Sequence, residues 1–212
     1  MNVVGPSDHF SPLFPDDCLE DIVGRVFVAW GRIPKPITEV LEIRITKLLR
    51  HQYAYDPVIK QLPFQVRREL PIDDPATGDE LGRIDLCLLH GNDEDVYFAF
   101  ECKRLNVTFP SGKFESLAAA YVGPEGIGCF VSRKYAAGQQ HGGMIGYVFD
   151  GNISAARTAI SKQFVKRMDN LSLVSDGLVE CRFALTNDGL RETQHGIDGT
   201  TLAIYHLLLS VV

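Results

Sequence analysis

The stretch YFAFECKRL, residues 97–105, runs an apolar segment directly into a glutamate and a lysine that are two positions apart. Successive side chains of a strand alternate across a sheet, so Glu101 and Lys103 share one face and Cys102 points to the other. The pattern therefore predicts a strand with one face in the core and with a carboxylate beside an ammonium group on the opposite face.

A second predicted strand, GRIDLCLL at residues 82–89, carries Asp85, and the turn-rich stretch HGNDE separates the two strands. Apolar strands joined by a short turn favour antiparallel pairing, and a meander of three strands is expected here. When the two strands pair in this way, Asp85 and Glu101 meet on one face of the sheet, and Lys103 lies one pleat further along.

These charges end strands that are otherwise almost wholly apolar, where unpaired charge is costly to bury. A hard divalent cation suits the arrangement, because Mg²⁺ prefers carboxylate and carbonyl oxygens and keeps several of its waters. Asp85 and Glu101 supply the carboxylates, and the carbonyl of Cys102 completes the ligand set without using its thiol. The alternative interpretation is an ion-pair cluster on the surface of the sheet.

Helices and further strands are predicted on either side of this strand pair. A loose arm and an amphipathic helix over 16–31 form an N-terminal unit, residues 1–35, and a single domain follows over 36–212. The apolar stripe of the first helix either packs on its own domain or forms the contact of a homodimer. The other predicted elements are a helix from Pro36 with an apolar side at Ile37, Val40, Leu41, Ile45 and Leu48, a strand over 64–70, a helix over 115–121, a strand over 142–149, a helix over 152–171, and strands over 178–186 and 201–212.

Asp85 on one strand, followed by ECK at residues 101–103 on the next, resembles the motif of the PD-(D/E)XK nuclease superfamily, with Ile84 in place of the proline of its Pro-Asp step. The order of helix, three strands, helix and strand over residues 36–149 is similar to the αβββαβ core of that superfamily. The resemblance implies an α/β restriction endonuclease-like fold with a mixed central sheet flanked by helices. It also implies a nuclease that depends on Mg²⁺, with Mn²⁺ as a substitute, and that hydrolyses phosphodiester bonds of nucleic acid, with DNA favoured.

Many members of that superfamily also place a glutamate from the first core helix at the metal. Glu42 is the matching position here because it borders the apolar side of the helix predicted from Pro36. Glu39, on the same helix, is the alternative. With Asp85 and Glu101 as metal ligands, Lys103 orients the attacking water or stabilises the transition state. The alternative is a catalytically inactive protein of the same fold that serves as a nucleic-acid-binding or interaction subunit.

Three other polar residues each have two interpretations. Glu69, at the end of the strand predicted over 64–70, is either an outer carboxylate of the site or an exposed strand end. Gln139 and Gln140 either contact phosphate and the attacking water or belong to a polar loop.

The composition of the chain limits the class of protein, the compartment and the partners that are expected. A chain of 212 residues with 45% hydrophobic and 23% charged side chains suits a soluble globular domain, and its net charge of −6 argues against general coating of nucleic acid. Five cysteines without a CxxC pair favour buried thiols in a reducing compartment. Neither a membrane span nor a signal peptide is indicated, so a cytoplasmic location without membrane association is expected. No helix-turn-helix or zinc finger is apparent, so sequence-specific targeting requires loops or a partner protein.

Overall fold

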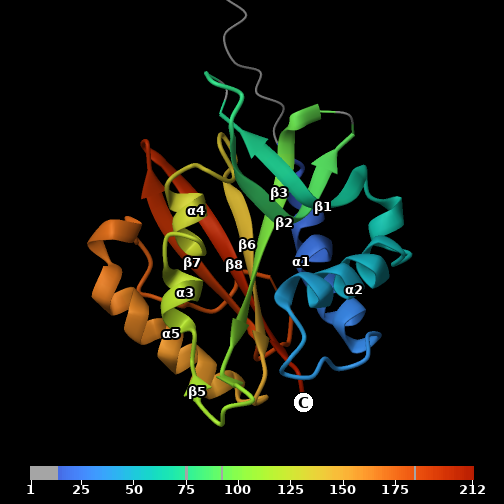
Figure 1. The fold of residues 1–212 in the computed structure, drawn as a ribbon. Helices are drawn as coiled ribbons and strands as arrows, with labels where there is room; N and C mark the ends of the chain where they lie inside the picture. Colours follow the sequence, from blue (N-terminus) through green and yellow to red (C-terminus); the bar gives the residue numbers. More distant parts are fainter. Residues whose placement is uncertain (1–13, 75, 92, 184) are drawn as a thin grey trace, which may run out of the picture.

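The computed structural model describes residues 14–74, 76–91, 93–183 and 185–212, and its centre is a mixed six-stranded sheet (Figure 1). The strand order is β1-β2-β3-β6-β8-β7. β1, β2 and β3 are antiparallel neighbours, β6 runs parallel to β3, β8 runs parallel to β6, and β7 runs antiparallel to β8. The bounds are β1 Phe64–Asp73, β2 Glu80–His90, β3 Asp93–Leu105, β6 His141–Val148, β7 Leu190–Ile197 and β8 Thr200–Ser210.

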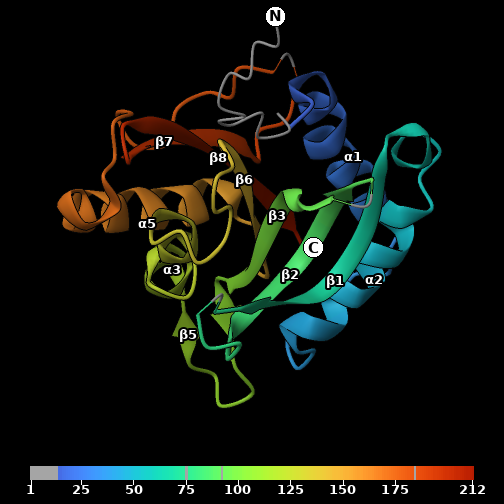
Figure 2. The same ribbon diagram turned by 90° about the horizontal axis from the view of Figure 1, so that it is seen from above.

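Helices cover both faces of the sheet (Figure 2). α1 and α2 pack on one face, whereas α3, α4 and α5 pack on the other. A parallel strand pair needs a crossover, and the segment between β3 and β6 holds the short hairpin β4–β5 together with α3 and α4. The bounds are α1 Leu19–Gly31, α2 Glu42–Ala54, β4 Val107–Thr108, β5 Phe114–Glu115, α3 Ala118–Val122, α4 Ile127–Val131 and α5 Ile153–Arg167, with single 3₁₀ turns at Asp16–Cys18, Ile59–Gln61 and Asp169–Leu171.

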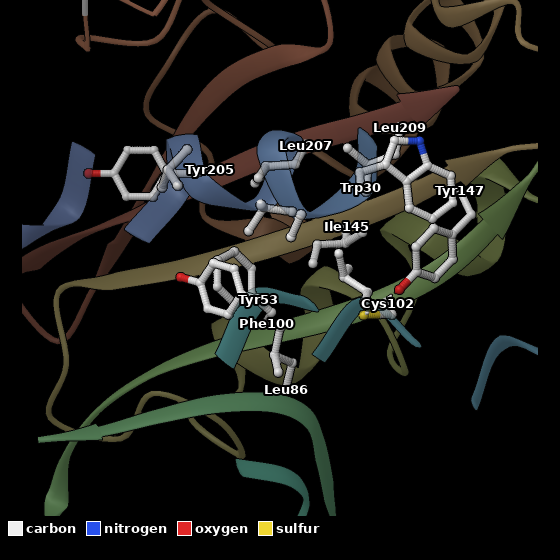
Figure 3. Packing of buried hydrophobic residues seen from close by; sticks show 14 of the residues in the cluster. Trp30, Tyr53, Leu86, Phe100, Cys102, Ile145, Tyr147, Tyr205, Leu207 and Leu209 are labelled. Atoms are coloured by element: carbon white, nitrogen blue, oxygen red, sulfur yellow. Dashed lines mark hydrogen bonds between the residues drawn. The ribbon is translucent and has the colours of Figure 1, made fainter. Parts of the chain in front are cut away.

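The apolar stripe of α1 is buried in the core between the sheet and the helices α1 and α2 (Figure 3). The rings of Trp30 and Tyr147 stack with 5.4 Å between their centroids, and the indole N–H of Trp30 donates to the carbonyl of Ser210 at 2.7 Å. The hydroxyl of Tyr53 on α2 donates to the carbonyl of Ile22 on α1 at 2.8 Å. The prediction that this stripe packs on its own domain is confirmed.

The α/β class and the mixed sheet flanked by helices are also confirmed, as is the antiparallel meander of the first three strands. Apolar periodicity located these elements because most of their inward side chains are apolar. The predicted elements that the structure contains, with ends shifted by a few residues, are the helices over 16–31 and 152–171 and the strands over 64–70, 82–89, 95–105, 142–149 and 201–212.

The helix predicted from Pro36 is present as α2, but its predicted start is wrong. The chain turns at Ile37, whose carbonyl accepts from the N–H of Val40 at 3.0 Å, and α2 begins only at Glu42. Counting the helical period from Pro36 therefore puts the apolar side out of phase. The inward side chains of α2 are Ile45, Thr46, Leu49 and Tyr53, whereas Ile37, Leu41 and Leu48 are exposed.

The strand predicted over 178–186 is also wrong. Among the described residues of this stretch, 178–183 and 185–186, Val179 makes an isolated bridge to Glu192, and the antiparallel partner of β8 is the later strand β7. β7 escaped prediction because its buried side chains include Glu192, Thr193 and His195, whose polarity hides the strand pattern. The helix predicted over 115–121 begins at Ala118 and is followed by a second short helix, α4.

All five cysteines are free thiols. Cys87, Cys102 and Cys129 are buried as predicted, whereas Cys18 and Cys181 are partly exposed. Among the helices in the described ranges, none has the length and apolar character needed to cross a membrane.

Candidate functional site

Three carboxylates and a lysine gather where β2, β3 and the first turn of α2 meet. Asp85 comes from β2, Glu101 and Lys103 from β3, and Glu42 is the first residue of α2. The ammonium group of Lys103 forms an ion pair with Oε1 of Glu101 and lies 4.0 Å from Oε1 of Glu42. The structure thus brings together four residues that are separated by up to 61 positions in the sequence, since Glu42 and Lys103 are the outermost pair.

The two strands separate at this point, and carboxylates take over the freed backbone groups. Pairs between β2 and β3 run from Leu86↔Phe100 to His90↔Asp93. Beyond Phe100 the N–H of Cys102 donates to Oδ2 of Asp85 at 2.7 Å. A buried backbone N–H needs an acceptor, so Asp85 satisfies β3 where the ladder to β2 ends.

Glu42 performs the same function from the helix. Its Oε2 accepts a hydrogen bond from the backbone N–H of Arg104 at 2.7 Å, which ties the first turn of α2 to β3. Glu39, in contrast, is exposed, and its nearest polar partner is the hydroxyl of its neighbour Thr38 at 3.3 Å. Of the two glutamates considered from the sequence, Glu42 is therefore the one that joins the cluster.

Glu101 is the most deeply buried acid of the cluster, with 5% of its surface exposed. Its Oε1 faces Lys103, but its Oε2 is fully buried and has no hydrogen-bond partner among the described residues. Burial, reinforced by the charge of Asp85 and opposed by Lys103, raises the pKa of Glu101 to about 8. A buried carboxylate oxygen without a partner is energetically costly, so a cation would be stabilised beside it.

The other titratable groups of the cluster also have shifted pKa values. Burial raises the pKa of Glu42 to about 7, against the opposing charge of Lys103. Burial also raises the pKa of Asp85. Burial disfavours the charged form of Lys103, but Glu101 and Glu42 outweigh it and raise the pKa of the ammonium group. Lys103 therefore remains protonated at neutral pH and is a hydrogen-bond donor rather than a base.

The donor set fits a hard divalent cation by its chemistry, because it consists of carboxylate oxygens, one of them unpartnered. Its geometry is not that of a finished coordination shell. Within the described ranges, no group of three or more His, Cys, Asp and Glu side chains is arranged closely enough to hold a metal ion. Oδ2 of Asp85 and Oε2 of Glu42 are engaged by backbone N–H groups, and Oε1 of Glu101 is engaged by Lys103. The carboxylate oxygen left without a partner for a cation is therefore Oε2 of Glu101.

The thiol of Cys102 points away from the carboxylates into the core beneath α1 and α2 (Figure 3). It accepts a hydrogen bond from the hydroxyl of Tyr147 at 3.6 Å, and that hydroxyl also lies 3.0 Å from the hydroxyl of Thr46. Burial keeps the pKa of the thiol well above its ordinary value. Of Cys102, only the backbone therefore lies on the side of the acidic cluster.

Glu69 lies at the partly exposed rim of the cluster. It falls between the pairs Arg68↔Leu86 and Leu70↔Ile84, opposite Asp85, and its φ of 54° is in the left-handed region. Its carboxylate is 3.4 Å from the guanidinium of Arg68, and its charge contributes to raising the pKa of Asp85. The left-handed conformation costs a non-glycine residue about 1 kcal/mol, and such strain concentrates at functional sites.

Gln139 and Gln140 occupy the loop that leads into β6. Gln139 is buried, and its backbone N–H donates to the carbonyl of Ala136 at 3.0 Å. Gln140 is exposed, and its carbonyl accepts from the N–H of Ala203 at 2.9 Å. Through these backbone contacts, both residues help to hold the chain in place where β6 begins.

Tyr135 and Cys129 were not predicted from the sequence, yet both lie near the acidic cluster. Burial is the main cause that raises the pKa of each of these side chains, and the negative charge of Glu101 is the second. The hydroxyl of Tyr135 donates to the carbonyl of Arg83 at 2.5 Å, which holds the loop after α4 against β2. Neither residue belongs to a strand pattern or a motif, so no signal in the sequence could have identified it.

No family model, curated protein or solved structure matches this chain. The functional interpretation therefore depends on the geometry of the cluster.

Proposed function

We propose that the protein is a Mg²⁺-dependent nuclease that hydrolyses phosphodiester bonds of nucleic acid, with DNA as the favoured substrate. The observation that carries the proposal is the buried, unpartnered Oε2 of Glu101 within a cluster of three carboxylates that faces Lys103. The order of elements from α2 to β6, with β6 parallel to β3, supports a restriction endonuclease-like αβββαβ core around this cluster.

In this proposal the carboxylates bind the metal ion, and Lys103 stabilises negative charge on the substrate. Asp85, Glu101 and Glu42 would hold the metal ion, and the carbonyl of Cys102 is the fourth candidate ligand. When bound, Mg²⁺ or Mn²⁺ neutralises charge on the phosphate and acidifies a water molecule. Lys103, which remains protonated, donates hydrogen bonds to that water and to the phosphate oxygens as negative charge develops on them.

A binding protein of the same fold without catalysis is the second candidate. The observation that favours it is that the carboxylate oxygens of Asp85 and Glu42 already serve backbone N–H groups, a purely structural use. The unpartnered oxygen of Glu101 favours the nuclease, because a surface that only binds phosphate gains nothing from a buried carboxylate. The three buried free thiols support a reducing compartment, and we infer a cytoplasmic location.

The test is cleavage of linear duplex DNA, supercoiled DNA, single-stranded DNA and RNA in Mg²⁺, Mn²⁺ or EDTA. Wild type is compared with Asp85→Asn, which retains an acceptor for the N–H of Cys102 but loses the charge. We expect metal-dependent cleavage of at least one DNA substrate and a loss of at least about 100-fold in the variant. Wild-type protein that binds these nucleic acids but cleaves none of them in either metal would support the binding protein instead.

A further inference from the structure

The helix α2 and the turn before it expose large apolar side chains to solvent. The inward side chains of α2 pack against the sheet, but four large apolar side chains of the helix and of the preceding turn are exposed, and two of them, Ile37 and Leu48, line one groove. The four side chains and their exposed fractions are Ile37 66%, Leu41 60%, Ile43 46% and Leu48 43%.

The groove has a volume of about 470 Å³. Its apolar floor includes Ile37, Val40 and Leu48, and its cations are Lys35, Arg44 and Lys47. None of the described residues that line the groove is acidic, although the whole chain has a net charge of −6. Apolar surface with a rim of one charge is typical of a site for another macromolecule.

The cations of the groove are available to a partner. Arg44 and Lys47 make no side-chain hydrogen bond or ion pair within the described part of the chain. Lys35 is held at the edge of the groove, with its ammonium group 4.4 Å from the centroid of the Trp30 ring and 3.4 Å from the carbonyl of Ser210. Neither of these two contacts neutralises its charge.

We propose that this groove, formed by the turn before α2 and the outer side of the helix, binds an acidic amphipathic helix of a partner protein. The apolar side of that helix rests on Ile37, Val40 and Leu48, and its carboxylates pair with Lys35, Arg44 and Lys47. Nucleic acid fits less well, because the described residues that line the groove include no aromatic ring on which a base could stack. The inference is independent of the nuclease proposal, since Glu42 reaches β3 from the inner side of the helix.

The test is fluorescence anisotropy with a labelled synthetic peptide that has leucine at positions i, i+3, i+4 and i+7 and glutamate elsewhere. A scrambled peptide of the same composition, a peptide with lysine in place of glutamate and a labelled single-stranded oligonucleotide are the comparison probes. The protein variants are Lys47→Glu and Leu48→Ser, both at exposed positions of the groove, and Val165→Ser, an equally conservative change at an exposed position of α5.

We expect saturable binding of the acidic amphipathic peptide, at least about 10-fold weaker in Lys47→Glu and in Leu48→Ser and unchanged in Val165→Ser. No binding by the wild type, or equal binding of the scrambled peptide, would overturn the proposal. Oligonucleotide binding that both groove variants lose would assign the groove to nucleic acid instead. Self-association in sedimentation that Leu48→Ser abolishes would assign it to a second copy of the chain.

Discussion

At the scale of single residues, Glu101 is the side chain whose environment is hardest to explain by structure alone. Its carboxylate is almost fully buried, one oxygen lacks a partner, and two other acids lie nearby. A protein that needed only an ion pair for Lys103 would be more stable with fewer acids around it. The position is explained if a cation joins the cluster during function.

Replacing Glu101 with glutamine should stabilise the metal-free protein at alkaline pH. Because burial raises the pKa of Glu101 to about 8, the wild-type side chain is protonated at pH 5 and charged at pH 9, whereas glutamine is always neutral. We expect Glu101→Gln to increase the free energy of unfolding by about 2 kcal/mol at pH 9 and to change it little at pH 5. Urea denaturation in EDTA at both pH values measures this change in the free energy of unfolding. An equal change at pH 5 and pH 9 would contradict a raised pKa for Glu101.

At this scale the sequence predicts Asp85, Glu101 and Lys103, because the alternation of a strand places charges beside an apolar run in a visible pattern. The choice of Glu42 over Glu39 required the structure, since only the actual start of α2 decides which glutamate reaches β3. Tyr135 could not be predicted, because its place near Glu101 depends on a loop whose path has no local periodicity.

At the scale of elements, β7 and β8 are joined to the helical layer by a buried chain of hydrogen bonds. Nδ1 of His195 donates to the carbonyl of Leu171 at 2.7 Å, so its Nε2 accepts from the hydroxyl of Thr193 at 2.9 Å. Nε2 of His206 then donates to the oxygen of Thr193 at 2.9 Å, and its Nδ1 accepts from the hydroxyl of Tyr121 at 3.0 Å. This chain explains why polar residues are compatible with the interior of β7.

Thr193→Val should destabilise the protein by about 2 kcal/mol, because it leaves one buried nitrogen on each of His195 and His206 without a partner. Thr201→Val is the matched control, since Thr201 is an exposed position of β8 and the change should shift stability by less than about 0.5 kcal/mol. The free energies of unfolding in urea compare the two. Equal effects would show that the hydrogen-bonded chain contributes nothing.

The helix α2 and the strand β7 are the elements that sequence patterns describe worst, and for related reasons. The apolar residues from Ile37 to Leu48 fit a helical period, but several of them are exposed in the structure. The apolar pattern therefore includes residues on the surface as well as residues in the core. In β7 the inward side chains are polar and satisfy one another across the sheet. Patterns of hydrophobicity cannot represent partners that are distant in the sequence.

At the scale of the whole molecule, two groups of buried residues give stability opposite dependences on pH. Burial lowers the pKa of His206 to about 3 and also lowers that of His195. Their contribution is present above the ordinary histidine value and is lost as the pH falls towards 3, because the unfolded chain then binds more protons. Glu42 and Glu101 have raised pKa values, so the folded state retains protons that the unfolded chain has lost, and stability falls as the pH rises from about 4.5 to 8.

The metal-free protein should therefore be most stable between about pH 5 and 6, where these two windows overlap and their opposite slopes cancel. Mg²⁺ should add stability on the alkaline side, where Glu42 and Glu101 are charged, and little at pH 5, where protons compete for the same oxygens. Urea denaturation from pH 4 to pH 9, with Mg²⁺ or EDTA, measures both effects. Stabilisation by Mg²⁺ that is the same at pH 5 and pH 9 would contradict binding at these carboxylates.

The most direct test of the central claim compares the Mg²⁺-dependent cleavage rates of duplex DNA by Glu42→Gln and Glu39→Gln. The two changes are chemically identical and three positions apart, but only Glu42 reaches β3 and Lys103. We expect Glu42→Gln to lose at least about 100-fold in rate and Glu39→Gln to cleave at the wild-type rate. Equal rates in the two variants would contradict a catalytic metal centre formed by Glu42, Asp85 and Glu101.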